Sequence, residues 1–248
     1  MVLSWRISKG FSIPLMFTDL NKGGTSNTQE RLDLLKIFDE VFGIDRIKFL
    51  IADREFVGAD WFTTLNRKNI PYTIRVKKNM LLPWGKVPIP ARDLFQHLKI
   101  FETRLIEKRM YEDIVYFAGT ISQKGEFVIV MTNQPLKASQ ILIKYRQRWS
   151  IEELFRKLKS SGFHWENTHM KQSKRLVALL IILSFGILFA SLVGQEEKIP
   201  WKKTINYPLY SLFKQGLVTL QFLLSKSIEL AAETIQILLE KIQNVLFA

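Results

Sequence analysis

The chain has 248 residues, of which 47% are hydrophobic and 24% are charged, a balance that is ordinary for a folded globular protein. This composition excludes an intrinsically disordered, collagen-like or low-complexity chain. The sequence contains no cysteine, which excludes a disulfide framework, a thiolate metal site and a cysteine nucleophile. The histidines at positions 97, 164 and 169 lie far apart or in a loop-like context, so carboxylates would have to hold any catalytic metal.

The formal net charge is +13, and two segments carry the excess of positive charge. Residues 67–109 contain 11 basic and 3 acidic side chains, and residues 141–175 contain 9 basic and 3 acidic side chains. Concentrated Lys and Arg favour a polyanion as partner, because they release the counterions that are condensed on phosphates. An anionic membrane surface is the competing interpretation of the same charge.

The first elements that the sequence predicts are two short strands, Val2–Ile7 and Phe11–Phe17, with a turn at Lys9-Gly10 between them. Before these strands the N-terminus has no basic lead, so it is not a signal peptide. A helix is expected over Gln29–Phe42, where apolar side chains recur at helical spacing.

An apolar run of strand length, Ile47–Ala52, ends directly at Asp53. A short helix around Trp61–Leu65 and a strand over Tyr72–Val76 are expected next. This alternation of strands and helices predicts an α/β fold. Active residues in such sheets lie just beyond the carboxyl ends of strands, which makes Asp53 a candidate catalytic residue.

The texture of the sequence changes after Lys77, where prolines and short alternating apolar segments predict a β-rich insertion over about residues 77–133. A long helix is expected from Ala138 to about Ser160, and apolar helices from Tyr207 onward. No glycine-rich nucleotide loop occurs in the sequence, which disfavours dinucleotide enzymes and P-loop ATPases.

The segment Leu176–Val193 has 18 residues without a charge, and Lys174-Arg175 precede it. This length is at the lower edge of a transmembrane span. The alternative is a helix that is buried on all sides in a soluble core. We favour the buried helix, because the segment is short for a membrane span.

The helix expected after Ala138 contains the most informative residues. At about 100° per residue, Tyr145, Arg148, Glu152 and Lys159 share an arc of about 60° on one continuous helix. A carboxylate bordered by two cations and a phenol could bind a metal ion while its neighbours hold a phosphate. The structural alternative is an exposed ion pair between Arg148 and Glu152, which are four residues apart.

The spacing Tyr145-x2-Arg148-x3-Glu152-x6-Lys159 matches the YREK signature of the insertion-sequence-four type transposases, a branch of the DDE transposase family. The segment Ile51–Phe56 resembles the block around the second catalytic aspartate of that family.

Two further observations define how far the resemblance reaches. The segment Ser26–Arg31 is similar to the block that precedes that strand in the family. The resemblance runs from about Ser12 to the apolar segment near Val193, which is most of the chain.

The resemblance implies an RNase H-like mixed α/β sheet with flanking helices and a β-rich insertion. It also implies two Mg²⁺ ions, with Mn²⁺ as a substitute, held by three carboxylates that include Asp53 and Glu152. Tyr145, Arg148 and Lys159 would contact the phosphates of transposon-end DNA. The implied partners are double-stranded DNA and a second copy of the chain, with no membrane, in the bacterial cytoplasm.

The sequence departs from the family at its first catalytic aspartate, which should follow a strand before Val2. Asp19 follows the second predicted strand and is in the wrong place for this role. We therefore expect an N-terminally truncated catalytic domain over residues 1–195, a helical tail over 196–248, and impaired DNA cleavage. The alternatives are a non-catalytic DNA-binding remnant and a membrane-associated basic protein.

Overall fold

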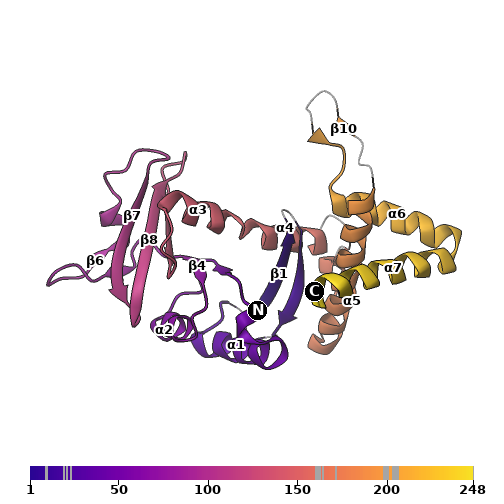
Figure 1. Ribbon diagram of the computed structural model, residues 1–248, viewed down its shortest axis with the longest axis horizontal. Helices are drawn as coiled ribbons and strands as arrows, with labels where there is room; N and C mark the ends of the chain where they lie inside the picture. The colour runs from indigo at the N-terminus through magenta and orange to yellow at the C-terminus, as the bar shows by residue number, and fades with distance from the viewer. Residues whose placement is uncertain are drawn as a thin grey trace. The chain divides into compact units, whose positions relative to one another are not determined.

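The computed structural model of the chain describes its residues apart from 9, 10, 19, 21, 23, 160–162, 164, 171, 198–200, 203–206 and 248. The chain divides into two compact units (Figure 1). The first comprises Met1–Leu3 and Met16–Trp149, and the second comprises Ser4–Leu15 and Ser150–Ala248. The division after residue 149 differs from the domain end that we expected at residue 195. The domain boundary at residue 195 stays a prediction.

The two N-terminal strands form where the sequence predicts them. β1 (Val2–Ser8) and β2 (Phe11–Phe17) make a two-stranded sheet of their own. At its base, the amino group of Met1 donates a hydrogen bond to the carbonyl oxygen of Thr18, 2.6 Å away. The expected turn at Lys9-Gly10 lies outside the described residues.

The first unit contains a mixed five-stranded sheet with the order β3-β4-β9-β8-β7. β3 and β4 are parallel, and every other neighbouring pair is antiparallel. The strands are β3 (Leu50–Ala52), β4 (Tyr72–Arg75), β7 (Thr103–Met110), β8 (Asp113–Ile121) and β9 (Phe127–Thr132). The mixed α/β class that we expected from the sequence is confirmed.

The segment over residues 77–133 is rich in strands, and its three long strands extend the sheet that β3 and β4 begin. A small second sheet pairs β5 (Leu81–Leu82) with β6 (Ile89–Pro90), and the 3₁₀ helix Ala91–Leu94 follows. This segment is therefore continuous with the main sheet, because β9 pairs directly with β4.

Helices cover both faces of this sheet. α1 (Thr28–Phe42), the 3₁₀ helix Ile44–Arg46 and α2 (Ala59–Arg67) supply apolar side chains to the larger core, together with one face of β4, β8 and β9. α3 (Ala138–Arg146) packs against the other face, where Ala118 and Val130 are buried. Side chains that alternate along the strands fill these two cores, as expected for a sheet that is covered on both faces.

The long helix that we predicted from Ala138 to Ser160 is in fact two helices, and this prediction was wrong. α3 ends at Arg146, and α4 (Trp149–Lys159) begins after a turn at Gln147 and Arg148. The backbone N–H of Arg148 bonds to the carbonyl of Tyr145 at 2.9 Å, three residues back, so the last turn is tightened. The polar stripe that we placed on one continuous helix therefore spans two helices.

The second unit contains three long helices, α5 (Ser173–Glu196), α6 (Leu212–Lys226) and α7 (Ile228–Phe247). The short strands β10 (Trp201–Lys202) and β11 (Tyr207–Pro208) pair between α5 and α6, and the 3₁₀ helix Trp165–Thr168 precedes α5. α5 and α6 approach closely at two glycines, Gly194 and Gly216. A Cβ on Gly216, for example, would lie 1.7 Å from the carbonyl oxygen of Ala190.

α5 carries the apolar segment that the sequence singled out. Lys174–Glu196 is the one helix, in the part of the chain that the structure describes, that is long and apolar enough to cross a membrane. Only 33% of its apolar window is buried, and Ile182 is 65% exposed. The expectation of a helix buried on all sides is therefore wrong, because α5 packs on α6 and leaves other side chains exposed. The absence of a membrane partner stays a prediction.

Candidate active site

Asp53 lies directly after β3, at the carboxyl end of this strand, where the sequence placed it. A turn begins here, in which the N–H of Phe56 bonds to the carbonyl oxygen of Asp53 at 2.9 Å. The N–H of Arg54 donates to Asp53 Oδ1 at 2.7 Å. The Asp53 side chain is 39% exposed, so its carboxylate is fixed at the surface and still open to a ligand.

α3 and the turn after it bring two predicted site residues to this carboxylate. The hydroxyl of Tyr145 donates a hydrogen bond to Asp53 Oδ1 at 3.2 Å, although the two residues are 92 positions apart in the sequence. Arg148 Nη1 lies 3.7 Å from Asp53 Oδ2. Side chains three residues apart nearly eclipse in a 3₁₀ turn, which explains why the tightened end of α3 presents both groups to one acid.

Burial and charge set the protonation of Tyr145. Burial raises its pKa above the usual value, and the negative charge of Asp53 adds to this effect. The positive charges of Arg148 and Arg75 act in the opposite direction but do not outweigh burial. Tyr145 therefore keeps its proton at neutral pH and acts as a hydrogen-bond donor to Asp53.

Sequence reasoning missed Arg75, which ends β4. Ala52 and Ile74 are register partners in the parallel pair, so the residues that follow them, Asp53 and Arg75, lie at the same edge of the sheet. The signal was available, because Arg75 lies near the carboxyl end of the predicted strand Tyr72–Val76, and the carboxyl ends of parallel strands meet at one edge of a sheet. Its guanidinium adds a second positive charge near Tyr145.

Glu152 and Lys159 lie on α4 and belong to the second unit, whereas Asp53, Tyr145 and Arg148 belong to the first. Glu152 is in the first turn of α4 and is partly buried, and Lys159 ends the helix and is exposed. The structure brings three of the five predicted site residues together. The meeting of Asp53 with Glu152 stays a prediction.

Asp53 offers the type of ligand that a divalent cation prefers, but not a complete set of ligands. Carboxylate oxygens are the ligands that Mg²⁺ prefers. Among the described residues, however, no group of three His, Cys, Asp or Glu side chains is arranged to hold a metal ion. Asp19, which we had set aside, lies outside those residues. Asp53 can therefore serve as one ligand of a divalent cation. A complete metal site would need further carboxylates in addition to Asp53.

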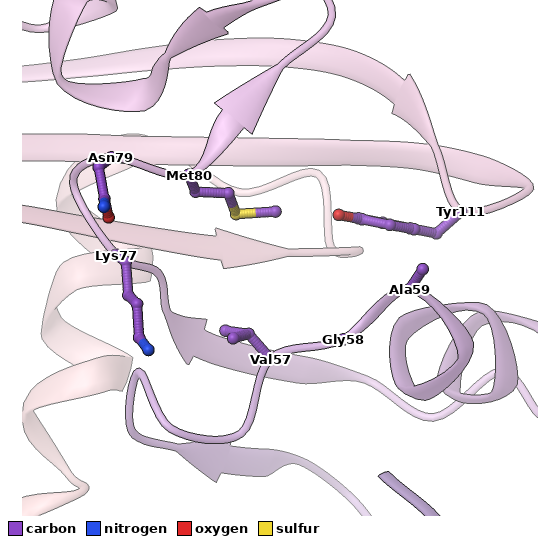
Figure 2. Close-up of a pocket in the computed structure, with 7 residues that line it drawn as sticks. All are labelled: Val57, Gly58, Ala59, Lys77, Asn79, Met80 and Tyr111. Atoms are coloured by element: carbon purple, nitrogen blue, oxygen red, sulfur yellow. The ribbon is translucent and has the colours of Figure 1, made fainter. Parts of the chain in front are cut away.

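A shallow pocket of about 280 Å³ lies on the first unit, past the end of the turn that starts at Asp53 (Figure 2). The side chains of Met80 and Tyr111 point toward one another across it. Its other lining residues are Val57, Gly58, Ala59, Lys77 and Asn79. None of the predicted site residues lines this pocket.

Comparison with known proteins gives one family. The family model described as "Transposase DDE domain" matches residues 13–189. No curated protein matches the chain.

Among solved structures, the chain resembles one described as the cryo-EM structure of the piggyBac transposase synaptic complex with hairpin DNA. The TM-score is 0.50 at 9% sequence identity, and the match covers 94% of this chain and 48% of that chain. This likeness concerns the fold, and the chain spans about half the length of that relative. The mixed sheet with helices on both faces agrees with the RNase H-like architecture that we expected.

Proposed function

The chain belongs to the transposase DDE domain family, and from this premise we propose that it acts on the ends of a bacterial insertion sequence of the insertion-sequence-four type. The family supports a polynucleotidyl transferase type of enzyme, which cleaves and joins DNA strands. The YREK spacing from Tyr145 to Lys159 supports the narrower assignment. The reaction would be hydrolysis of a phosphodiester bond at the transposon end, followed by strand transfer.

The single observation that carries this proposal is the contact of Asp53 with Tyr145 and Arg148. These residues come from two sequence blocks that resemble the same family, and the structure joins them within 3.2 and 3.7 Å. An exposed ion pair between Arg148 and Glu152, which was the structural alternative, does not explain why Arg148 lies beside Asp53.

We assign the roles of Asp53, Tyr145 and Arg148 from this geometry together with the resemblance, and those of Glu152 and Lys159 from the resemblance alone. Asp53 and Glu152 would hold divalent cations, which DDE transposase domains generally use. When bound, such cations would supply the charge that stabilises the attacking and leaving oxygens of phosphoryl transfer. Tyr145 and Arg148 orient the Asp53 carboxylate, and together with Lys159 they face the phosphates of double-stranded DNA.

Arg148 has a second effect on the same carboxylate. A guanidinium 3.7 Å from Asp53 Oδ2 lowers the repulsion between this acid and an approaching phosphate. The guanidinium can also bind a phosphate by two hydrogen bonds, which a lysine ammonium cannot do in the same geometry.

A second candidate function is DNA binding without cleavage. One observation favours it, which is that the described part of the chain holds no group of three acids or histidines arranged for a metal ion. We also propose that the chain pairs with a second copy and that it works in the cytoplasm without a membrane partner.

The test is nicking of a supercoiled plasmid that carries the transposon ends, with Mg²⁺ or Mn²⁺. We expect slow nicking that Asp53→Asn and Glu152→Gln both abolish. Glu40→Gln is the matched control, because Glu40 is an exposed acid on α1. Salt-sensitive DNA binding with no nicking would favour the second function. Retention of the protein in carbonate-washed membranes would contradict both.

A further inference from the structure

Arg31, on α1, is a buried cation that ends the family-like block Ser26–Arg31 and has no role in the site described above. Its side chain is almost wholly buried, with the residue 5% exposed. Nη1 donates to the carbonyl oxygen of Val57 at 3.0 Å, and Nη2 donates to the carbonyl oxygens of Glu55, at 2.7 Å, and of Ser26. Nε donates to Ser26 Oγ at 3.0 Å.

Two of the groups that accept these hydrogen bonds, the carbonyl oxygens of Glu55 and Val57, belong to the loop that starts at Asp53. Glu55 and Val57 lie within the segment between β3 and α2, and the guanidinium lies 5.1 Å from the ring centre of Phe56 between them. The start of α1 also approaches the end of this loop, because a Cβ on Gly58 would lie 2.9 Å from Thr28 Oγ1. Arg31 therefore holds the loop at its far end, while Asp53 anchors its near end.

A buried guanidinium is a costly way to join a helix to a loop. Removing a charge from water is unfavourable unless hydrogen bonds replace its hydration, and an apolar side chain could fill the same volume. Arg31 satisfies its donors with backbone carbonyls at fixed positions. The planar fork of the guanidinium fixes the direction of each carbonyl, which neither an apolar residue nor a lysine can do.

We infer that Arg31 is a positioning residue: its guanidinium fixes the carbonyl groups of Glu55 and Val57, and so the turn that presents the Asp53 carboxylate to Tyr145 and Arg148. The link runs through the turn itself, in which the N–H of Phe56 bonds to the carbonyl of Asp53 and the N–H of Arg54 bonds to its carboxylate. The catalytic meaning of this link rests on the proposed function, whereas the link itself is a property of the fold.

The first test is amide hydrogen exchange on the full chain with Arg31→Lys. We expect the amides of Arg54 and Phe56 to lose protection, while those of the paired strands β8 and β9 keep it. Arg67→Lys is the matched control, because Arg67 is an exposed arginine that pairs with Glu112 at 2.6 Å on the same unit. Unchanged protection at Arg54 and Phe56 would overturn the inference, and so would an equal loss in β8 and β9, which indicates a general role in folding.

A second variant covers the case in which Arg31→Lys does not fold. Ser26→Ala removes the acceptor of the Nε hydrogen bond and leaves Arg31 in place. We expect a smaller loss of protection at the same two amides, and no loss at either of them would overturn the inference.

The third measurement is plasmid nicking over a range of DNA concentrations. A misplaced carboxylate lowers the maximal rate by about 100-fold, and the DNA concentration at half-maximal rate should stay the same. Nicking by Arg31→Lys at the rate of the unsubstituted chain would overturn the positioning role. If the unsubstituted chain does not nick DNA, the proposed cleavage fails, and the exchange experiment still decides whether Arg31 holds the loop.

Discussion

The contact between Tyr145 and Asp53 can be measured without any enzymatic activity. We predict that Tyr145→Phe and Asp53→Asn are coupled in a double-mutant cycle of unfolding free energies, because Tyr145→Phe removes the donor of their hydrogen bond and Asp53→Asn removes the charge that strengthens it. The chain should still fold in each variant, since Phe keeps the buried ring and Asn keeps the acceptor of the Arg54 N–H.

The structure sets the size of this coupling. A hydrogen bond to a charged group contributes about 1.5–3 kcal/mol to stability when it is well formed and buried. Here the oxygen atoms are 3.2 Å apart, which is long for a hydroxyl and a carboxylate, and the Asp53 side chain is 39% exposed. We therefore expect a coupling energy of about 1 kcal/mol, below the range for buried charged bonds.

The assay is urea unfolding of the full chain, followed by fluorescence, for the unsubstituted protein, both single variants and the double variant. Tyr116→Phe is the matched control, because Tyr116 packs partly buried in the same core cluster as Tyr145. It should be additive with Asp53→Asn. Coupling below about 0.3 kcal/mol for Tyr145, or equal coupling for Tyr116, would refute the contact on which the site is built.

Three further predictions concern packing and pH. Gly216→Ala should separate α5 from α6 and lower the melting temperature by several degrees, because its Cβ would collide with the backbone of Ala190. Gly119→Ala should destabilise the chain by about 1–3 kcal/mol in urea unfolding, because its Cβ would lie 2.2 Å from the buried ring of Phe95. Burial raises the pKa of Tyr72, so the folded chain keeps a proton that the unfolded chain releases near pH 10; stability should fall above that pH, and Tyr72→Phe should weaken the fall.

The strand that ends at Asp53 was predictable, and so was the class of the fold. An apolar run of strand length with an acid after it has few other interpretations, and the structure places β3 at Leu50–Ala52. Leu50 and Ala52 pack against one core and Ile51 against the other, as three consecutive apolar residues in a strand predict. The local sequence pattern was sufficient to predict this strand, because a strand that is covered on both faces has an apolar residue at every position.

The burial of Arg31 and its hydrogen bonds to the loop after Asp53 could not be predicted in the same way. An arginine in the first turns of an amphipathic helix is normally solvated, and nothing in the pattern around it indicates burial. Its burial depends on where the carbonyls of Glu55 and Val57 point, and these residues lie 24 and 26 positions later in the sequence than Arg31. Tertiary hydrogen bonds of this kind leave no periodic trace in the sequence.

The prediction of one continuous helix was wrong, because α3 and α4 are separate, yet two residues that it grouped together do meet at Asp53. We placed Tyr145 and Arg148 on one side of a continuous helix, and that helix ends at Arg146. The two side chains still reach Asp53, because residues three apart share a side in both an α-helix and a 3₁₀ turn. Helical periodicity does not relate Arg148 to Glu152 in this way, because Arg148 lies in the turn and Glu152 lies on α4. The YREK spacing therefore spans the end of α3, a turn and the whole of α4, rather than one continuous helix.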